Sequence, residues 1–168
     1  MFDVQLAWDR PKRAGTNNTE HYLRIRLHPA VPAQGQGVAA RVALALDTSG
    51  SMKGTRLDHA RRACLALVRA LRPQDQVSLA TFATGVNALV SDQRRDAVDL
   101  AALEQQLAAL VANGVTRTDL ALAWLEKVLG DGGGARIAAL VTDGSPTNVE
   151  GQVLDDVSPL VTAAQRLG

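Results

Sequence analysis

The sequence predicts an α/β fold in which helices flank a mostly parallel sheet. Residues 39–46 and 136–142 are almost continuously apolar, which is typical of strands covered on both faces. Stretches with apolar residues at three- and four-residue spacings alternate with such strands, as in βα repeats. The length of 168 residues is about that of one domain and is enough to bury a core of its own.

The first part of the chain has a different pattern. Residues 2–8 and 21–28 alternate apolar and polar side chains, as half-buried strands do, and a loop rich in Pro, Gly, Asn and Thr separates them. A stretch with two prolines and two glycines follows at 29–37. We therefore expect an N-terminal β-strand extension and linker at 1–38 and the main domain at 39–168.

Strands and helices are then predicted in alternation to the end of the chain. Pro73 ends the first helix, and Ser158-Pro159 is typical of a helix cap and first turn. We expect strands at 39–46, 76–83, 86–90 and 136–142, and helices at 57–71, 99–111, 118–129 and from 158 onward. Strand 136–142 should pair with strand 41–46, and the N-terminal strands are candidates to extend the sheet.

Composition excludes several classes of function. The net charge of +1 gives no electrostatic signature of nucleic-acid binding, and no apolar run approaches the ~20 residues that span a bilayer. A single cysteine, Cys64, excludes an intrachain disulfide and a cysteine-based zinc site. The N-terminus lacks the basic and apolar regions of a secretion signal. We therefore expect a cytoplasmic protein that binds neither nucleic acid nor membrane.

Oxygen-bearing side chains follow two of the apolar strands. Asp47 and Asp143 end these strands, and ligands of open α/β sheets bind beyond the carboxyl ends of the strands. Two carboxylates that meet there repel each other unless a cation lies between them. Ser49 and Ser51 add hydroxyls at every second residue after Asp47, on the same side of an extended turn. Such hard ligands favour Mg²⁺, with Mn²⁺ or Ca²⁺ as alternatives, over zinc or copper.

Each of these motifs also has an ordinary structural interpretation. The Asp-x-Ser-x-Ser segment could cap the helix that follows it, and Asp143-Gly144 is a common turn dipeptide. Their joint occurrence at the ends of two buried strands favours a metal site.

The same residues resemble the metal-ion-dependent adhesion site (MIDAS) of von Willebrand factor type A (VWA) domains. Asp47-Thr48-Ser49-Gly50-Ser51-Met52 is similar to the family's DxSxS-M element. Gly114-Val115-Thr116 is similar to its threonine element, and Leu140-Val141-Thr142-Asp143-Gly144 to its aspartate element. The three elements occur in the family's order. The resemblance covers roughly residues 39–168, and the helix from Gly54 to Leu71 is like that of bacterial members.

The resemblance implies a Rossmann-like sheet with the ion at its top. Ser49 and Ser51 would bind the ion directly, Thr116 directly or through water, and Asp47 and Asp143 mainly through waters. Thr118 competes with Thr116 for the threonine role, but Thr116 occupies the family's GxT position, which leaves Thr118 to cap the helix. Family domains continue beyond the helix that starts near Ser158, so we expect the domain in this chain to be incomplete at its C-terminal side.

The implied function is that of a non-enzymatic, metal-dependent protein-interaction domain. Two carboxylates leave a dication electrophilic, so an Asp or Glu of a partner protein could complete its coordination. Bacterial domains of this kind often belong to systems with ATPases, kinases or phosphatases.

Two other interpretations stay open. The first is a magnesium-dependent phosphoryl-transfer enzyme with Asp47 as nucleophile. Such an enzyme usually has a second carboxylate two residues later, where this chain has Ser49, and a catalytic lysine, which is not evident here. The second is a structural domain that has lost its ion, and the complete set of ligands argues against it.

Overall fold

The chain consists of two compact units, Met1–Gly37 and Val38–Gly168, in a computed structural model. The structure describes residues 2–8, 23–29, 38–130, 134–143 and 146–167. In the first unit, β1 (Phe2–Trp8) pairs antiparallel with β2 (Leu23–Pro29) in a two-stranded sheet. These strands, which we expected as candidates to extend the main sheet, pair with each other in a sheet of their own. Strands close in sequence can pair this way because the loop between them costs little entropy to close.

The second unit contains a four-stranded sheet in the order β5-β4-β3-β6. Its elements are β3 (Arg41–Asp47), the 3₁₀ turn η1 (Gly50–Met52), α1 (Thr55–Ala70), β4 (Gln76–Phe82), β5 (Val86–Arg94), the 3₁₀ turn η2 (Arg95–Ala97), α2 (Leu100–Ala109), α3 (Thr118–Leu129), β6 (Arg136–Val141) and α4 (Ser158–Gln165). β3 pairs in parallel with β4 and β6, and only β5, at one edge, is antiparallel. The predicted α/β class and the pairing of strand 136–142 with strand 41–46 are confirmed.

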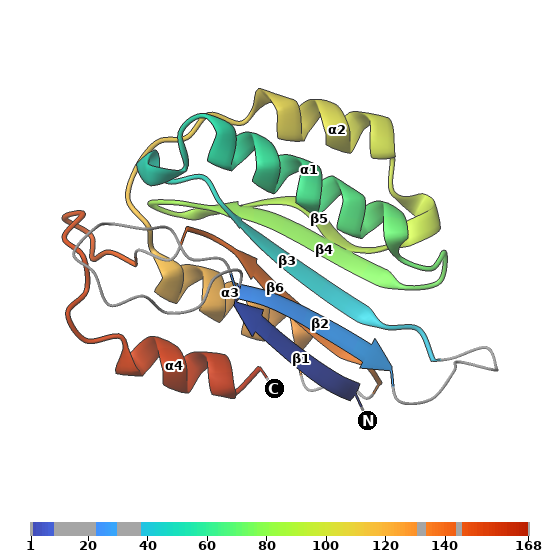
Figure 1. Cartoon of the computed structure of the whole chain (residues 1–168). Coiled ribbons are helices and arrows are strands. Elements are labelled where there is room, and N and C mark those ends of the chain that lie inside the picture. The colour runs from blue at the N-terminus through green and yellow to red at the C-terminus, as the bar shows by residue number, and fades with distance from the viewer. Residues whose placement is uncertain (1, 9–22, 30–37, 131–133, 144–145, 168) are drawn as a thin grey trace. The chain divides into compact units, whose positions relative to one another are not determined.

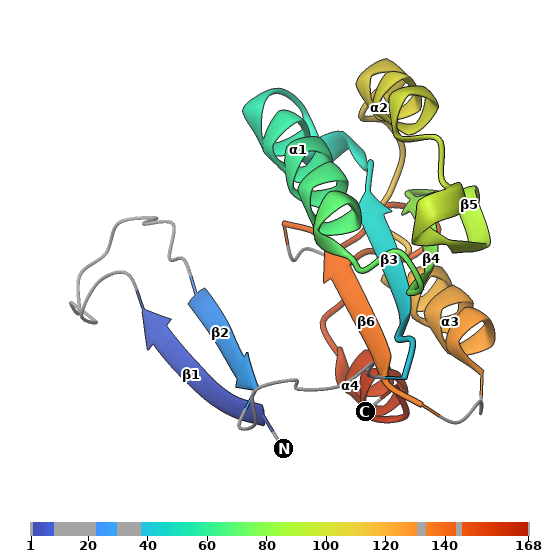
Figure 2. The same cartoon turned by 90° about the vertical axis from the view of Figure 1, so that its right-hand side faces the viewer.

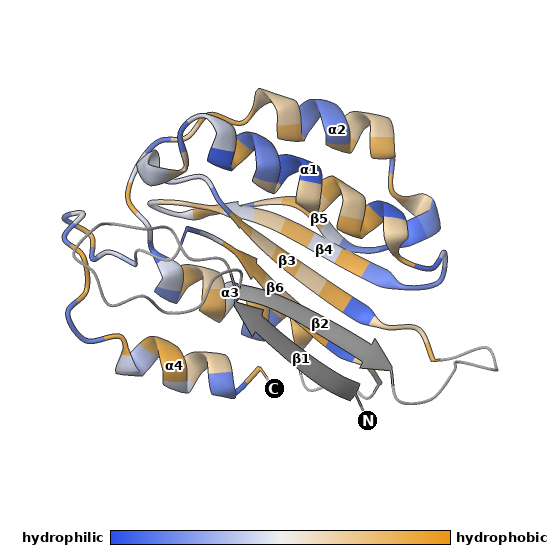
Figure 3. Cartoon of the chain, in the orientation of Figure 1, coloured by the Kyte–Doolittle hydropathy of each residue, from blue (hydrophilic) through white to orange (hydrophobic). Residues whose placement is uncertain are grey.

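The helices cover both faces of this sheet, as Figures 1 and 2 show, with α1 and α2 on one face and α3 and α4 on the other. The central strand β3 is hydrophobic over most of its length (Figure 3) and serves both cores. Val42, Leu44 and Leu46 belong to the core with α1 and α2, whereas Ala43 and Ala45 pack with α3. The continuous apolar run therefore reflects a strand buried on both sides.

Several boundaries differ from the sequence prediction by a few residues, and the ends of β5 and α2 are two examples. β5 continues through the polar residues 91–94, because an edge strand tolerates polar side chains that a central strand does not. α2 ends at Ala109, two residues before the predicted end, and its carboxylate cap is Asp99, which accepts hydrogen bonds from the N–H groups of Ala101 and Ala102 at 3.0 Å each. No helix among the described residues is long and apolar enough to cross a membrane.

A buried carboxylate fixes the end of the sheet that lies opposite Asp47. Asp75 is 4% exposed, and it accepts hydrogen bonds from Ala40 N at 2.9 Å, Arg72 N at 2.9 Å and Arg72 Nη2 at 2.8 Å. Burial by itself would raise the pKa of Asp75, but these hydrogen bonds and the Arg72 charge outweigh it and hold the pKa below its ordinary value of 3.8. Asp75 therefore connects the start of β3 to the end of α1.

We expect Asp75→Asn to lower the free energy of unfolding by about 1–3 kcal/mol at neutral pH, because buried N–H donors lose their charged acceptor. Urea denaturation measures this loss, with Asp96→Asn, which breaks an exposed pair with Arg94, as a near-neutral control. The contribution of Asp75 is present above its unfolded pKa and disappears as the pH falls through the lower folded pKa. A stability difference that stays constant from pH 7 to below that range would contradict this role.

Candidate metal centre

The register of the sheet brings the two predicted carboxylates to one edge. Leu46 pairs with Val141, so Asp47 at the end of β3 lies beside Thr142, and Asp143 follows one residue later. On the other side Asp47 pairs with Phe82 at the end of β4. The carboxyl ends of three parallel strands therefore meet here, as the sequence predicted.

Asp47 is fully buried, with 0% of its surface exposed. Its Oδ1 accepts a hydrogen bond from Ser49 N and its Oδ2 accepts one from Thr142 Oγ1, each at 2.7 Å. Within the described part of the chain, no basic side chain forms an ion pair with Asp47. A buried carboxylate without a positive partner is costly, so a cation beside it would supply the missing charge.

The two serines of the turn after β3 place their hydroxyls together. Ser49 is buried and Ser51 is exposed, and their Oγ atoms lie 3.0 Å apart. Neighbouring ligands of an octahedral Mg²⁺ ion, at ~2.1 Å from the metal, are separated by about the same distance. The spacing of the serine hydroxyls therefore fits a shared hard cation, and Ser51 leaves that side accessible to solvent.

Backbone hydrogen bonds hold the loop that contains Thr116, here called the threonine loop, against this turn. Gly50 N donates to Gly114 O at 3.0 Å, and Asn113 N donates to Thr48 O at 2.8 Å. Gly114 has a φ of +84°, and a Cβ there would lie 2.5 Å from Thr84 Oγ1, so this position requires glycine. The GxT pattern thus has glycine at this position because the threonine loop closely approaches the turn at Thr84.

Thr116 is held in place by the segment that follows β6. It is 3% exposed, its N–H donates to Thr147 Oγ1 at 2.8 Å, and its carbonyl accepts from Thr147 N at 2.9 Å. Thr118 is the first residue of α3, and Arg117 occupies the N-cap position without a capping side-chain hydrogen bond. The expectation that Thr118 caps this helix is therefore wrong, because the turn places it one residue too late.

Asp143 differs from Asp47 in having a basic partner. Arg56, in the first turn of α1, places its Nη1 3.3 Å from Asp143 Oδ2 and 3.1 Å from Ser51 O. The side chain of Asp143 is 15% exposed and that of Arg56 is 54% exposed. The guanidinium thus bridges the serine turn and the aspartate element, and sequence reasoning missed it because the pair spans 87 residues.

The contacts link the predicted residues unequally. Hydrogen bonds and the Arg56 ion pair join Asp47, Ser49, Ser51 and Asp143, whereas Thr116 is connected to the serine turn through the backbone of its loop. Among residues whose placement is described, no group of three or more His, Cys, Asp or Glu side chains that could hold a metal ion is found. The candidate set is therefore two carboxylates and three hydroxyls, a donor set that fits Mg²⁺ better than a transition metal.

Several solved structures have a similar fold. A von Willebrand factor type A protein from Catenulispora acidiphila matches with a TM-score of 0.62 and 20% identity, over 98% of this chain and 37% of that chain. The vWF domain of the type V pili tip protein Mfa5 from Porphyromonas gingivalis has a TM-score of 0.57 and 22% identity, over 67% and 40%. The pilus adhesin SpaC from Lactobacillus rhamnosus GG has a TM-score of 0.57 and 19% identity, over 87% and 19%. The chain thus spans less than half of each of these proteins.

None of the curated proteins compared with the chain matches it. A family model described as the von Willebrand factor type A domain matches residues 42–145, which is more than half of the chain. The matched region runs from β3 past Asp143 and so includes all five candidate ligands. The chain therefore belongs to the von Willebrand factor type A domain family.

Proposed function

We propose that this chain is a protein-interaction domain whose contact with its partner depends on a divalent cation. Mg²⁺, with Mn²⁺ or Ca²⁺ as alternatives, is held by Asp47, Ser49, Ser51, Thr116 and Asp143 in the manner of a MIDAS. A carboxylate from an Asp or Glu of the partner completes the coordination. The observation that carries the proposal is the fully buried Asp47 carboxylate, for which the described residues provide hydrogen bonds but no positive charge.

The proposed ligands suit an ion that must accept one more oxygen. The formal charge of the two carboxylates just balances that of a dication, and the three hydroxyls add no negative charge. A bound cation would supply a Lewis-acidic position, and an acidic side chain is the natural protein ligand for it. The similarity to a pilus tip protein and a pilus adhesin supports an interaction role, and partners such as ATPases or kinases remain part of the proposal.

The burial of Asp47 disfavours the alternative of a phosphoryl-transfer enzyme. A nucleophilic aspartate must reach the phosphorus atom, yet Asp47 is 0% exposed and both of its oxygens accept hydrogen bonds. The position two residues later is Ser49, which lacks the carboxylate that would act as acid and base.

We expect Asp47→Asn to weaken Mg²⁺ binding about tenfold or more, because it removes charge at the site while keeping the shape of the side chain. Isothermal titration calorimetry should show one site in the wild type. Asp96→Asn removes a distant, exposed carboxylate and should bind Mg²⁺ like the wild type. Circular dichroism verifies that both variants fold, and unchanged affinity in folded Asp47→Asn would refute the assigned site.

Partner binding should require the cation. Immobilised protein is expected to capture a partner in Mg²⁺ and to release it when EDTA is added. Thr116→Ala should reduce capture more than it reduces Mg²⁺ affinity, because it disturbs the ligand shell that accepts the partner's carboxylate. Equal partner affinity in Mg²⁺ and in EDTA would mean that the partner docks elsewhere.

Arg56 should make the cation bind more weakly than it otherwise would. We expect Arg56→Gln to tighten Mg²⁺ binding about three- to tenfold at low ionic strength, because a positive charge that also pairs with Asp143 is removed. The gain should shrink in high salt as charges are screened. Arg69→Gln is the matched control, since it removes the same charge from the other end of α1 and breaks a pair with Glu104. Weaker Mg²⁺ binding in Arg56→Gln would instead show that Arg56 supports the site by holding Asp143.

A further inference from the structure

We propose that the pocket beside the candidate metal centre binds an apolar side chain of the partner segment whose carboxylate reaches the cation. The recognised sequence would then be an acidic residue with an aliphatic residue close to it. This proposal rests on the proposed function and adds to it the chemistry of the partner.

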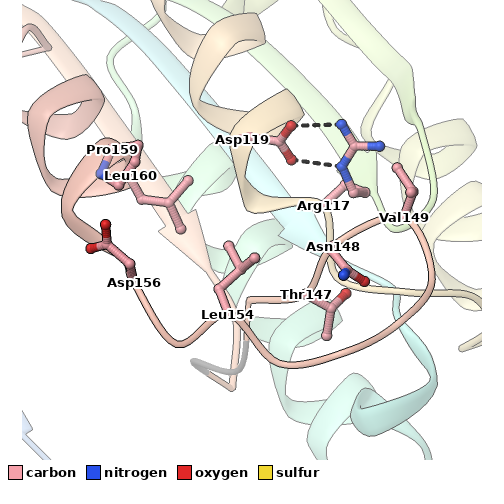
Figure 4. Close-up of a pocket in the computed structure, with 9 residues that line it drawn as sticks. All are labelled: Arg117, Asp119, Thr147, Asn148, Val149, Leu154, Asp156, Pro159 and Leu160. Carbon is pink, nitrogen blue, oxygen red and sulfur yellow. Dashed lines mark hydrogen bonds and ion pairs between the residues drawn. The ribbon is translucent and has the colours of Figure 1, made fainter.

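The pocket lies between the start of α3 and the segment that leads into α4, and its volume is about 330 Å³. Figure 4 shows the side chains of Leu154 and Leu160 pointing toward each other, beside the ion pair of Arg117 and Asp119. This volume is at the lower end of the range for ligand pockets, so it suits one bulky side chain with its adjoining backbone.

The pocket and the metal centre share a wall. Thr147 lines the pocket, and its Oγ1 accepts the hydrogen bond from Thr116 N at 2.8 Å. Arg117, which also lines the pocket, directly follows Thr116 in the chain. An extended partner segment advances about 3.3 Å per residue, so a side chain within a few positions of the metal-bound acid can reach the pocket.

The polar side chains of the pocket are already engaged with each other or with backbone. Arg117 donates to both carboxylate oxygens of Asp119, at 2.8 and 2.6 Å. Asn148 Oδ1 accepts two backbone N–H groups at 3.0 Å each, and Asp156 Oδ1 accepts from Ser158 N at 2.9 Å. A polar guest would compete with these hydrogen bonds, and a second acidic guest would meet Asp119 and Asp156. The free lining is therefore apolar, and it favours an aliphatic guest.

The segment that walls the pocket also carries exposed apolar residues. Val149, which lines the pocket, is 62% exposed, and Val153 and Val157 are 65% and 43% exposed. The bridge between Thr147 and Val153 and the hydrogen bonds of Asn148 hold this turn in shape. Exposed apolar residues gathered beside a pocket are typical of protein-contact surfaces.

The test is selection of short random peptides with one fixed aspartate, displayed on phage, against the whole chain in Mg²⁺ with elution by EDTA. We expect the eluted peptides to share an aliphatic residue at a constant position near the aspartate. Replacing that residue by serine in a synthetic peptide should weaken binding about tenfold or more, as expected for loss of a buried aliphatic side chain.

A double-mutant cycle then locates the contact. The substitution Val149→Ser changes an exposed pocket residue, and Val38→Ser is the matched control at the opposite end of β3, where Val38 is 74% exposed. When Val149→Ser and the peptide's serine substitution are combined, peptide affinity should fall by less than the product of the two single fold-losses. Val38→Ser should leave peptide affinity unchanged.

The possible failures are distinguishable. EDTA-eluted peptides without an aliphatic preference, or a fully multiplicative cycle, would overturn the pocket proposal and leave the metal-dependent function standing. Aliphatic peptides that bind equally in EDTA would overturn the link between pocket and cation. A selection with no EDTA-sensitive peptides would refute the proposed function and this proposal together.

Discussion

The burial of one carboxylate at the end of the central strand is the constraint around which the site is built. β3 is covered by helices on both faces, so the Asp47 carboxylate lies directly at the end of a strand buried in hydrophobic surroundings. Ser49 N and Thr142 Oγ1 each donate to it, which ties the turn after β3 to the end of β6. The threonine loop is then fixed to the same turn through Gly50 and Gly114. Hydrogen bonds thus join three separate segments around one buried charge.

The two carboxylates of the site are held differently, and this difference matters for the proposed function. Asp47 is fixed by neutral donors, whereas Asp143 is partly exposed and pairs with the guanidinium of Arg56. Asp143 can therefore exchange one positive partner for another, while Asp47 keeps its position. Such an arrangement suits a site at which a cation and an acidic partner bind together. Under the proposal above, the pocket next to Thr147 would receive an apolar residue of that partner.

The sequence predicts the features that arise from local patterns. The apolar runs at 39–46 and 136–142 indicate two neighbouring strands, and α3 occupies the predicted range 118–129. Of these two strands only β3 is buried on both faces, because β6 lies at an edge of the described four-stranded sheet and its residues are exposed or half-buried. Contacts across long separations escape such reasoning. Arg56 pairs with Asp143 across 87 residues, and Thr116 bonds Thr147 across 31, and no spacing rule reveals either pair. The pairing partner of the N-terminal strands was likewise hidden, because alternation shows that a strand has two faces but not which strand lies beside it.

The most direct measurement is a titration of the isotopically labelled protein with Mg²⁺, followed by amide chemical shifts in NMR. A cation at the proposed site should shift the amides of 48–51, 114–116 and 142–143 together, with one saturating binding curve. The amides near Asp75, at the other end of the sheet, should not move. Shifts scattered over exposed carboxylates such as Asp92 and Glu104, or no saturable shift near Asp47, would contradict a metal site built on the buried aspartate.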